Sequence, residues 1–106
     1  MKTFLSLSAI LFLCACSPNW GKYQGKMDWY NAVETCKAIG KRLPTRSELR
    51  LAYRLERNKK WDKKQIAWYW TGESKSEKLA YNVHMNVGKV YGYLKTNQHQ
   101  HVRCIR

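Results

Sequence analysis

The chain has 106 residues, with 20 lysines and arginines, 7 aspartates and glutamates, and a formal net charge of +13. This length has room for one small domain and none for a second core. The positive charge favours polyanionic partners such as sulfated glycans, phosphorylated envelope lipids or nucleic acid, whereas so few scattered acidic residues argue against an oxygen-rich calcium site.

The first fifteen residues have the pattern of an export signal. A lysine precedes an apolar stretch, residues 4–13, that is too short to span a bilayer. The end of this stretch resembles the bacterial lipobox, and Ala15 makes Cys16 a better modification site than Cys14. The resemblance implies cleavage before Cys16, diacylglyceryl attachment there and a lipid anchor in the bacterial envelope, with Ser17 favouring the outer membrane. The alternatives are an ordinary secretory signal and a short membrane anchor.

Residues 16–26 are predicted to be a lipidated tether, because a proline and two glycines interrupt any regular pattern. The domain, residues 27–106, then begins with a helix that has Asp28 as its N-cap and Gly40 as its stop. At 100° per residue, the apolar side of this helix consists of Trp29, Ala32, Val33, Cys36 and Ile39.

A second helix is predicted from the capping box of Thr45 and Glu48 to about Arg57. Its apolar side holds Leu49, Ala52, Tyr53 and Leu55, and its four arginines lie within about 80° of one another on an ideal wheel. Guanidinium groups suit bidentate contacts to sulfate or phosphate, although such a surface can also be only a solvated helix face. The predicted anion-binding residues are Arg46, Arg50, Arg54 and Arg57 with Lys59, Lys60, Lys63 and Lys64.

The second half of the chain has the composition of β-strands. Residues 66–71 are aromatic and β-branched, and residues 72–78 form a polar turn. Residues 79–86 alternate between apolar and polar, which marks a half-buried strand; a glycine turn leads to its partner at 90–94, and residues 101–106 close the fold. The tryptophans and tyrosines of these strands favour sheet packing over a ligand-stacking platform. The sequence thus predicts an α+β fold.

Two cysteines remain once Cys14 leaves with the signal and Cys16 is lipidated. In an oxidising compartment, a disulfide between Cys36 and Cys104 would close a loop of about 69 residues and contribute roughly 4 kcal/mol on the chain-entropy model. The two thiols could instead bind a metal or take part in redox chemistry, but no CxxC spacing supports either role.

A series of short motifs links these elements to a known family. The series consists of Trp29, Ala32 and Cys36, then Arg42-Leu43-Pro44-Thr45 with Glu48-Leu49, then Trp70-Thr71, Ala80-Tyr81 and Val102-Arg103-Cys104-Ile105-Arg106. It covers nearly all of residues 27–106 and resembles the Lcl C-terminal domain family of bacterial collagen-like adhesins. The resemblance implies a C-type-lectin-like fold with two helices on a small antiparallel sheet, and a Cys36–Cys104 bridge from the first helix to the last strand. Members include surface proteins that bind glycosaminoglycans and other host or matrix components.

Departures from better-known relatives limit what this resemblance implies. The Glu-Pro-Asn, Gln-Pro-Asp and Trp-Asn-Asp triplets of calcium-dependent lectins do not occur, and neither do the extra cysteines of the related sulfatase-modifying enzymes. Of the histidines, His84, His99 and His101, the last two could share a strand face and bind a metal adventitiously, but such pairs are more typical of a surface. No GxSxG motif or carboxylate pair indicates catalysis.

The sequence therefore favours a membrane-anchored, non-catalytic binding module or adhesin for anionic ligands such as sulfated glycans. The alternative is an envelope protein whose basic face lies on membrane or lipopolysaccharide phosphates, and an enzyme is the third hypothesis. We expect no cofactor and no metal, and export argues against nucleic acid as the physiological partner.

Overall fold

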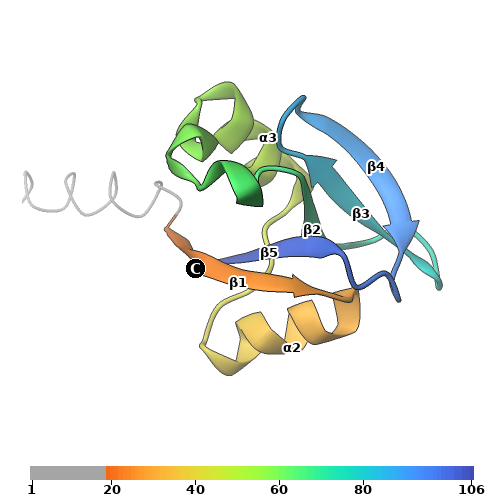
Figure 1. Ribbon diagram of the computed structural model, residues 1–106. Coiled ribbons are helices and arrows are strands. Elements are labelled where there is room, and N and C mark those ends of the chain that lie inside the picture. Colours follow the sequence, from red (N-terminus) through yellow and green to blue (C-terminus); the bar gives the residue numbers. More distant parts are fainter. Residues whose placement is uncertain (1–18) are drawn as a thin grey trace, which may run out of the picture.

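The computed structural model describes residues 19–106 as one five-stranded sheet with a helix on each face (Figure 1). The strand order is β1-β5-β2-β3-β4, and every pairing is antiparallel except that of β2 with β5. This arrangement confirms the predicted α+β class. The elements are β1 Trp20–Met27, α2 Trp29–Ala38, α3 Arg46–Arg54, the 3-10 turns η1 Arg57–Lys60 and η2 Lys63–Gln65, β2 Trp68–Ser74, β3 Leu79–His84, β4 Lys89–Leu94 and β5 Gln100–Ile105.

Both helices begin at the predicted caps. The Asp28 carboxylate accepts a hydrogen bond from the Asn31 backbone N–H at 2.8 Å, and Thr45 and Glu48 form a complete capping box. The second helix ends earlier than predicted, at Arg54 rather than near Arg57, because Glu56 adopts a left-handed backbone with φ 58°. The chain therefore leaves the helix axis before Arg57.

The predicted tether is wrong from residue 20 onward, because Trp20–Met27 is an edge strand of the sheet. β1 pairs with β5 from Trp20 opposite Ile105 to Met27 opposite Gln100. Two register shifts, one on either side of Tyr23, interrupt this pairing. They remove the alternation of apolar side chains by which a strand is recognised in sequence, and so the two glycines of the segment pointed to a tether.

The other strands follow the prediction more closely. β2 continues to Ser74, through the first residues of the predicted turn, whereas β3, β4 and β5 lie within one or two residues of their expected positions. The prediction of a half-buried β3 is wrong, because Ala80 and Asn82, the alternates of the expected apolar face, are fully buried. They are covered because this sheet packs on both faces.

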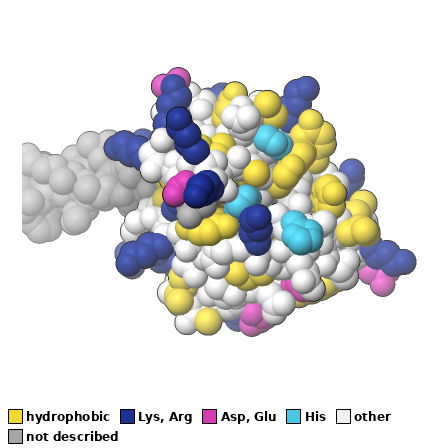
Figure 2. Space-filling view, viewed as in Figure 1, with side chains coloured by type: hydrophobic (Ala, Val, Ile, Leu, Met, Phe, Trp, Pro, Cys, Tyr) yellow, Lys and Arg dark blue, Asp and Glu magenta, His cyan; other side chains and the backbone are white. Residues whose placement is uncertain are grey.

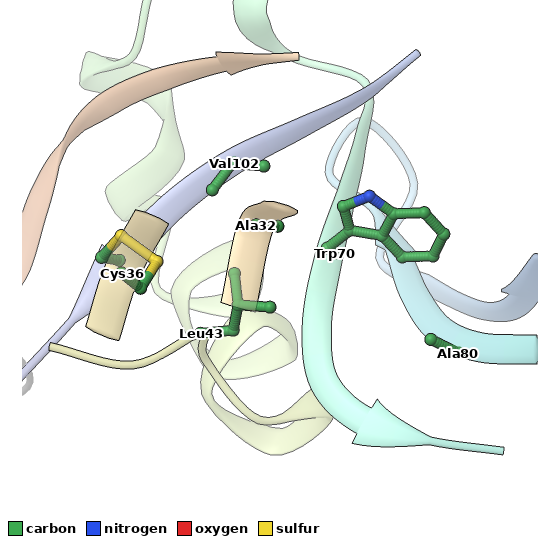
Figure 3. Close-up of a cluster of buried hydrophobic side chains, with 7 residues drawn as sticks. Ala32, Cys36, Leu43, Trp70, Ala80 and Val102 are labelled. Atoms are coloured by element: carbon green, nitrogen blue, oxygen red, sulfur yellow. A yellow bond between two sulfur atoms is a disulfide. The ribbon is translucent and has the colours of Figure 1, made fainter. Parts of the chain in front are cut away.

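Two hydrophobic clusters lie on opposite faces of the sheet. On the face of α2, the buried side chains are those of Ala32, Cys36, Leu43, Trp70, Ala80, Val102 and Cys104, most of which appear in Figure 3. On the face of α3, they are those of Leu49, Ala52, Tyr69, Val83 and Met85. Tyr69 and Trp70 are neighbours on β2 and point to opposite clusters, as alternation along a strand requires. Ile39 and Leu55, predicted to face the core, are instead 51% and 54% exposed.

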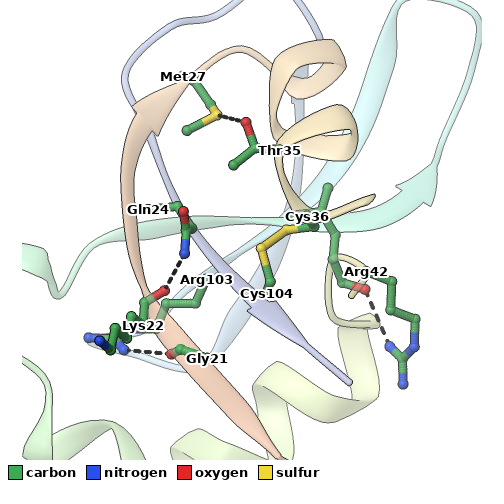
Figure 4. Close-up of a disulfide and its surroundings, with 10 residues drawn as sticks. Gly21, Lys22, Gln24, Met27, Thr35, Cys36, Arg42, Arg103 and Cys104 are labelled. Carbon is green, nitrogen blue, oxygen red and sulfur yellow. Dashed lines mark hydrogen bonds between the residues drawn. A yellow bond between two sulfur atoms is a disulfide. The ribbon is translucent and has the colours of Figure 1, made fainter. Parts of the chain in front are cut away.

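The disulfide between Cys36 and Cys104 is confirmed and joins α2 to β5 (Figure 4). The two Cα atoms are 5.4 Å apart, and both residues are completely buried within the α2 cluster. The bridge therefore belongs to the hydrophobic core. Among residues 19–106, no helix is long and apolar enough to cross a membrane.

Candidate anion-binding surface

Arg46, the first residue of the predicted arginine ridge, is held within the fold. Its Nε donates to Glu73 Oε1 at 2.9 Å, its backbone N–H donates to the same oxygen at 2.7 Å, and its guanidinium carbon lies 3.9 Å from the centre of the Tyr81 ring. Burial alone would raise the pKa of Glu73, but these two hydrogen bonds lower it overall. Arg46 thus fastens the start of α3 to β2 and β3, while its side chain stays 41% exposed.

The remaining arginines do not form one ridge. Arg50 and Arg54 are exposed on α3, whereas Arg57 belongs to η1, beyond the left-handed Glu56. Arg54 lines a pocket of about 340 Å³ that also includes Glu56 and Lys59, and these last two form an ion pair at 3.1 Å. Part of the positive charge at the end of α3 is therefore balanced locally.

The four predicted lysines are exposed on a short segment that one buried and one partly buried side chain hold in place. We call residues 59–64 the lysine segment. Asn58, just before it, is buried and donates its side-chain amide to the Met85 carbonyl at 2.7 Å. Trp61 packs edge-on against Trp20 at 5.5 Å between ring centres and lies under the Arg103 guanidinium at 4.5 Å. The lysine segment is consequently fixed beside the first residue of β1.

Arg50 lines a pocket together with a lysine that the sequence prediction did not include. Arg50 and Lys89 line an open pocket of about 480 Å³ together with Gly88, Val90 and Tyr91, which we call the β4-edge pocket. Gly88 has a φ of +74°, and a Cβ built there would lie 2.5 Å from the Tyr53 ring, so only glycine lets this turn approach α3. Spacing along the chain could not show that Lys89, a strand residue 39 positions away, would lie beside the helix.

From Arg50 to the end of the lysine segment, positive charge is dense and largely without ion-pair partners. Residues 50–64 contain seven lysines and arginines and two acidic residues. Among residues 19–106, Lys59 is the only one of these seven that forms an ion pair. Figure 2 shows lysine and arginine side chains over the upper left of this face, around α3 and the 3-10 turns, and further ones scattered elsewhere. A multivalent anion would relieve the repulsion between these groups.

The two histidines near the C-terminus, His99 and His101, have different surroundings. His99 is exposed, whereas His101 is buried and its Nδ1 lies 2.7 Å from the Tyr23 hydroxyl. Burial, together with the nearby charge of Lys26, lowers the pKa of His101. The expectation of two surface histidines is therefore wrong for His101, and residues 19–106 contain no group of three or more potential metal-binding side chains.

These observations define a small α+β domain with a basic surface divided between a pocket and a segment. The chain belongs to the family described as Domain of unknown function (DUF8780), whose model matches residues 21–106. That range includes nearly all of β1, as expected if this strand is part of the domain. No curated protein matches the chain. The predicted lipidation site, Cys16, lies outside the residues that the structure describes.

Proposed function

We propose that the protein is a lipid-anchored, non-catalytic binding module of the bacterial envelope that recognises anionic ligands, with sulfated glycans as the first candidates. The observation that carries this proposal is the convergence of Arg50 and Lys89 on one open pocket. Arg50 lies on a helix and Lys89 at the start of a strand, so the backbone of neither needs to be ordered by the ligand. A guanidinium and an ammonium together suit sulfate or phosphate oxygens.

Two features of the sequence support the same proposal. The lipobox-like end of the first fifteen residues would place the domain in the envelope, where extended anionic polymers are available. The resemblance to the Lcl C-terminal domain family, some of whose members bind glycosaminoglycans, favours a C-type-lectin-like module with this class of ligand. The disulfide between the first helix and the last strand is the bridge that this resemblance implies.

The proposal is tested by titrating heparin against the soluble domain at increasing salt. We expect affinity to fall steeply with salt, because exposed charges are screened within a Debye length of about 8 Å at physiological ionic strength. The triple variant Arg50→Ala, Arg54→Ala, Lys89→Ala should bind more weakly and with a smaller dependence on salt. We call it the pocket variant; Arg54 lies outside the β4-edge pocket, one turn further along α3. Absent or salt-insensitive binding by the unmodified domain would contradict the proposal.

A matched control removes the same charge elsewhere. Lys22, Lys37 and Lys78 are exposed on β1, on α2 and in the turn after β2, respectively. Changing all three to alanine also lowers the net charge by three but leaves the β4-edge pocket intact. If this control weakens heparin binding as much as the pocket variant does, net charge rather than the pocket carries the interaction.

A second candidate function is favoured by the position of the lysine segment. Trp61 holds this segment against Trp20, and Cys16 precedes Trp20 by four residues, which span at most about 14 Å. Lys59, Lys60, Lys63 and Lys64 would then contact the phosphates of the membrane that carries the anchor. Near an anionic membrane each such lysine contributes about fivefold to affinity.

Vesicles containing phosphatidylglycerol separate the two candidates. Replacing the four lysines of the segment by alanine should abolish vesicle binding by the unlipidated domain and affect heparin less than the pocket variant does. Equal loss of vesicle binding in the pocket variant would argue against a separate membrane-contacting segment.

A further inference from the structure

An aromatic surface lies on the outer part of the sheet, next to the β4-edge pocket. Cross-strand partners point to the same face of a sheet, and Trp70, Asn82 and Tyr91 are successive partners across β2, β3 and β4. Trp70 faces the α2 cluster, so Tyr91 also points to this face. By alternation along the strands, Trp68, His84 and Tyr93 lie on it too.

Helix α2 does not protect this part of the sheet from solvent. The helix packs against β1, β5 and β2, and it therefore covers the half of this face that is away from β3 and β4. Tyr91 and Tyr93 are each 42% exposed, although they lie on the same face as the buried Trp70. Figure 2 shows hydrophobic side chains, with histidine among them, exposed over the region of β3 and β4. We call Trp68, His84, Tyr91 and Tyr93 the aromatic face.

The rings of the aromatic face are held in place by one another. Trp68 makes T-shaped contacts with His84, at 4.4 Å between ring centres, and with Tyr91, at 4.7 Å. A T-shaped contact covers at most one face of each ring, and Tyr91 is 42% exposed, so part of its ring surface can be reached by a ligand. Tyr93 follows on the same side of β4, about 7 Å further along the strand. The two tyrosines therefore form a short row along the open edge of the sheet.

The polar atoms of these rings are available as well. Among the described residues, Trp68 Nε1–H and the hydroxyls of Tyr91 and Tyr93 form no hydrogen bond with the protein. His84 uses Nδ1 to accept from the Asn86 backbone N–H at 3.2 Å, which leaves Nε2 for another partner. The surface thus combines apolar ring faces with unsatisfied donors and acceptors, whereas a face evolved for hydrophobic burial would have few such groups.

We propose that the aromatic face binds the sugar rings of an anionic oligosaccharide whose charged substituents are held by Arg50 and Lys89. Tyr91 connects the two sites across the β4 edge. It lines the β4-edge pocket with Lys89 and with Arg50, which lies on the α3 side of the sheet, and it also contacts Trp68 on the α2 side. A pyranose ring presents an apolar face of C–H groups that packs on the electron-rich face of an aromatic ring, and its hydroxyls reach the polar atoms around it. This inference rests on the proposed function. It adds that the domain also recognises the sugar rings of the ligand, which charge alone does not select.

The other partners of an exposed aromatic face fit these observations less well. A second copy of the chain would bring two strongly positive domains together at Lys89 and Arg50, with a net charge of +13 on each full chain. A membrane surface would have to reach β4, the edge strand opposite to β1, which follows the predicted anchor. An anionic saccharide satisfies both the charge and the rings.

The test compares a heparin hexasaccharide with inorganic polyphosphate, an anion that has no rings. We expect Tyr91→Ala to weaken hexasaccharide binding by about fivefold or more, as removal of a stacking partner does elsewhere, with an unchanged dependence on salt. Tyr91→Phe should retain most of the affinity. Polyphosphate should bind the unmodified domain and Tyr91→Ala equally, and urea unfolding would show that the variant is folded. Tyr30→Ala is the matched control, because Tyr30 is an exposed tyrosine on α2, 51% accessible.

Each outcome separates this inference from the proposed function. If Tyr91→Ala leaves hexasaccharide affinity unchanged while the pocket variant still weakens it, the aromatic face is not part of the site and the proposed function stands. If the unmodified domain binds neither anion, both are wrong. If sedimentation shows a dimer that Tyr91→Ala dissociates, the face is a contact between copies and the inference is overturned.

Discussion

Glu48 accepts hydrogen bonds from two neighbouring residues at the start of α3. Its carboxylate accepts from the Thr45 backbone N–H at 2.8 Å and from the Arg42 guanidinium at 2.7 and 2.9 Å. The hydrogen bonds from Arg42, only partly opposed by burial, lower the pKa of Glu48 to about 2. The folded state therefore binds a proton at this site less readily than the unfolded chain, so the site contributes stability above about pH 4.5 that is lost as pH falls towards 2.

Replacing Glu48 should change both the stability and its response to acid. We expect Glu48→Ala to lower the free energy of unfolding at pH 7 by about 1–2 kcal/mol, the usual effect of losing a helix cap. Between pH 5 and pH 2, about the range over which Glu48 titrates in the two states, stability should decline less in the variant than in the unmodified protein. Urea unfolding at several pH values measures both effects. Glu34→Ala, an exposed change on α2, is the control.

Residue patterns predicted local partners well and distant ones poorly. The capping box of Thr45 and Glu48 was predicted because its spacing is local, and the structure confirms it. Arg46 was assigned to a ligand-binding ridge, because Glu73, 27 positions away, could not be recognised as its partner. Lys89 was missed for the same reason, since its distance from Arg50 in sequence hides the pocket that they share.

At the level of elements, the predictions succeeded where the hydrophobic period was regular. Helix α2 and the strands from β2 to β5 were recovered, and so was the covalent link between α2 and β5. β1 was missed because two register shifts break its alternation, and the division of the helices between two faces of the sheet was not predicted. Which face a helix covers depends on loop geometry, which periodicity does not encode.

The disulfide should be a large contributor to the stability of so small a domain. Its two cysteines are 68 positions apart, a separation at which a cross-link contributes roughly 4 kcal/mol on the chain-entropy model. Replacing both Cys36 and Cys104 by alanine should therefore lower the free energy of unfolding by about 2–5 kcal/mol, measured in urea under conditions where the variant still folds. Reduction of the unmodified protein is the matched control. A loss below about 1 kcal/mol would show that packing in the α2 cluster, not the cross-link, holds α2 on β5.

On the scale of the whole molecule, β1, which follows the predicted anchor, and the proposed ligand site lie at opposite edges of the sheet. β1 begins four residues after Cys16, and its first residue, Trp20, contacts Trp61 of the lysine segment, whereas β4 carries the pocket and two rings of the aromatic face. Four strand spacings separate these edges, roughly 19 Å. An anchored domain would thus turn its β4 edge away from the membrane.

This orientation can be measured on the lipidated protein in nanodiscs that carry a gadolinium-chelating headgroup. We expect the amide signals of residues 59–64 to broaden and those of β4 to remain sharp, since paramagnetic broadening falls steeply with distance. The same protein without the acyl chains is the control for non-specific contact. Broadening of β4 with sparing of the lysine segment would mean that the domain lies with its other edge on the bilayer.

The position of β5 inside the sheet also constrains when this protein can fold. Residues 100–105 lie between β1 and β2, and they carry one half of the disulfide. Until they are present, β1 has no neighbour in the sheet and Cys36 has no partner. Because these contacts join distant parts of the chain, their loop entropy must be overcome late. A chain that crosses a membrane from its N-terminus would stay unfolded for almost its whole passage, and would form its sheet and its cross-link only on the far side.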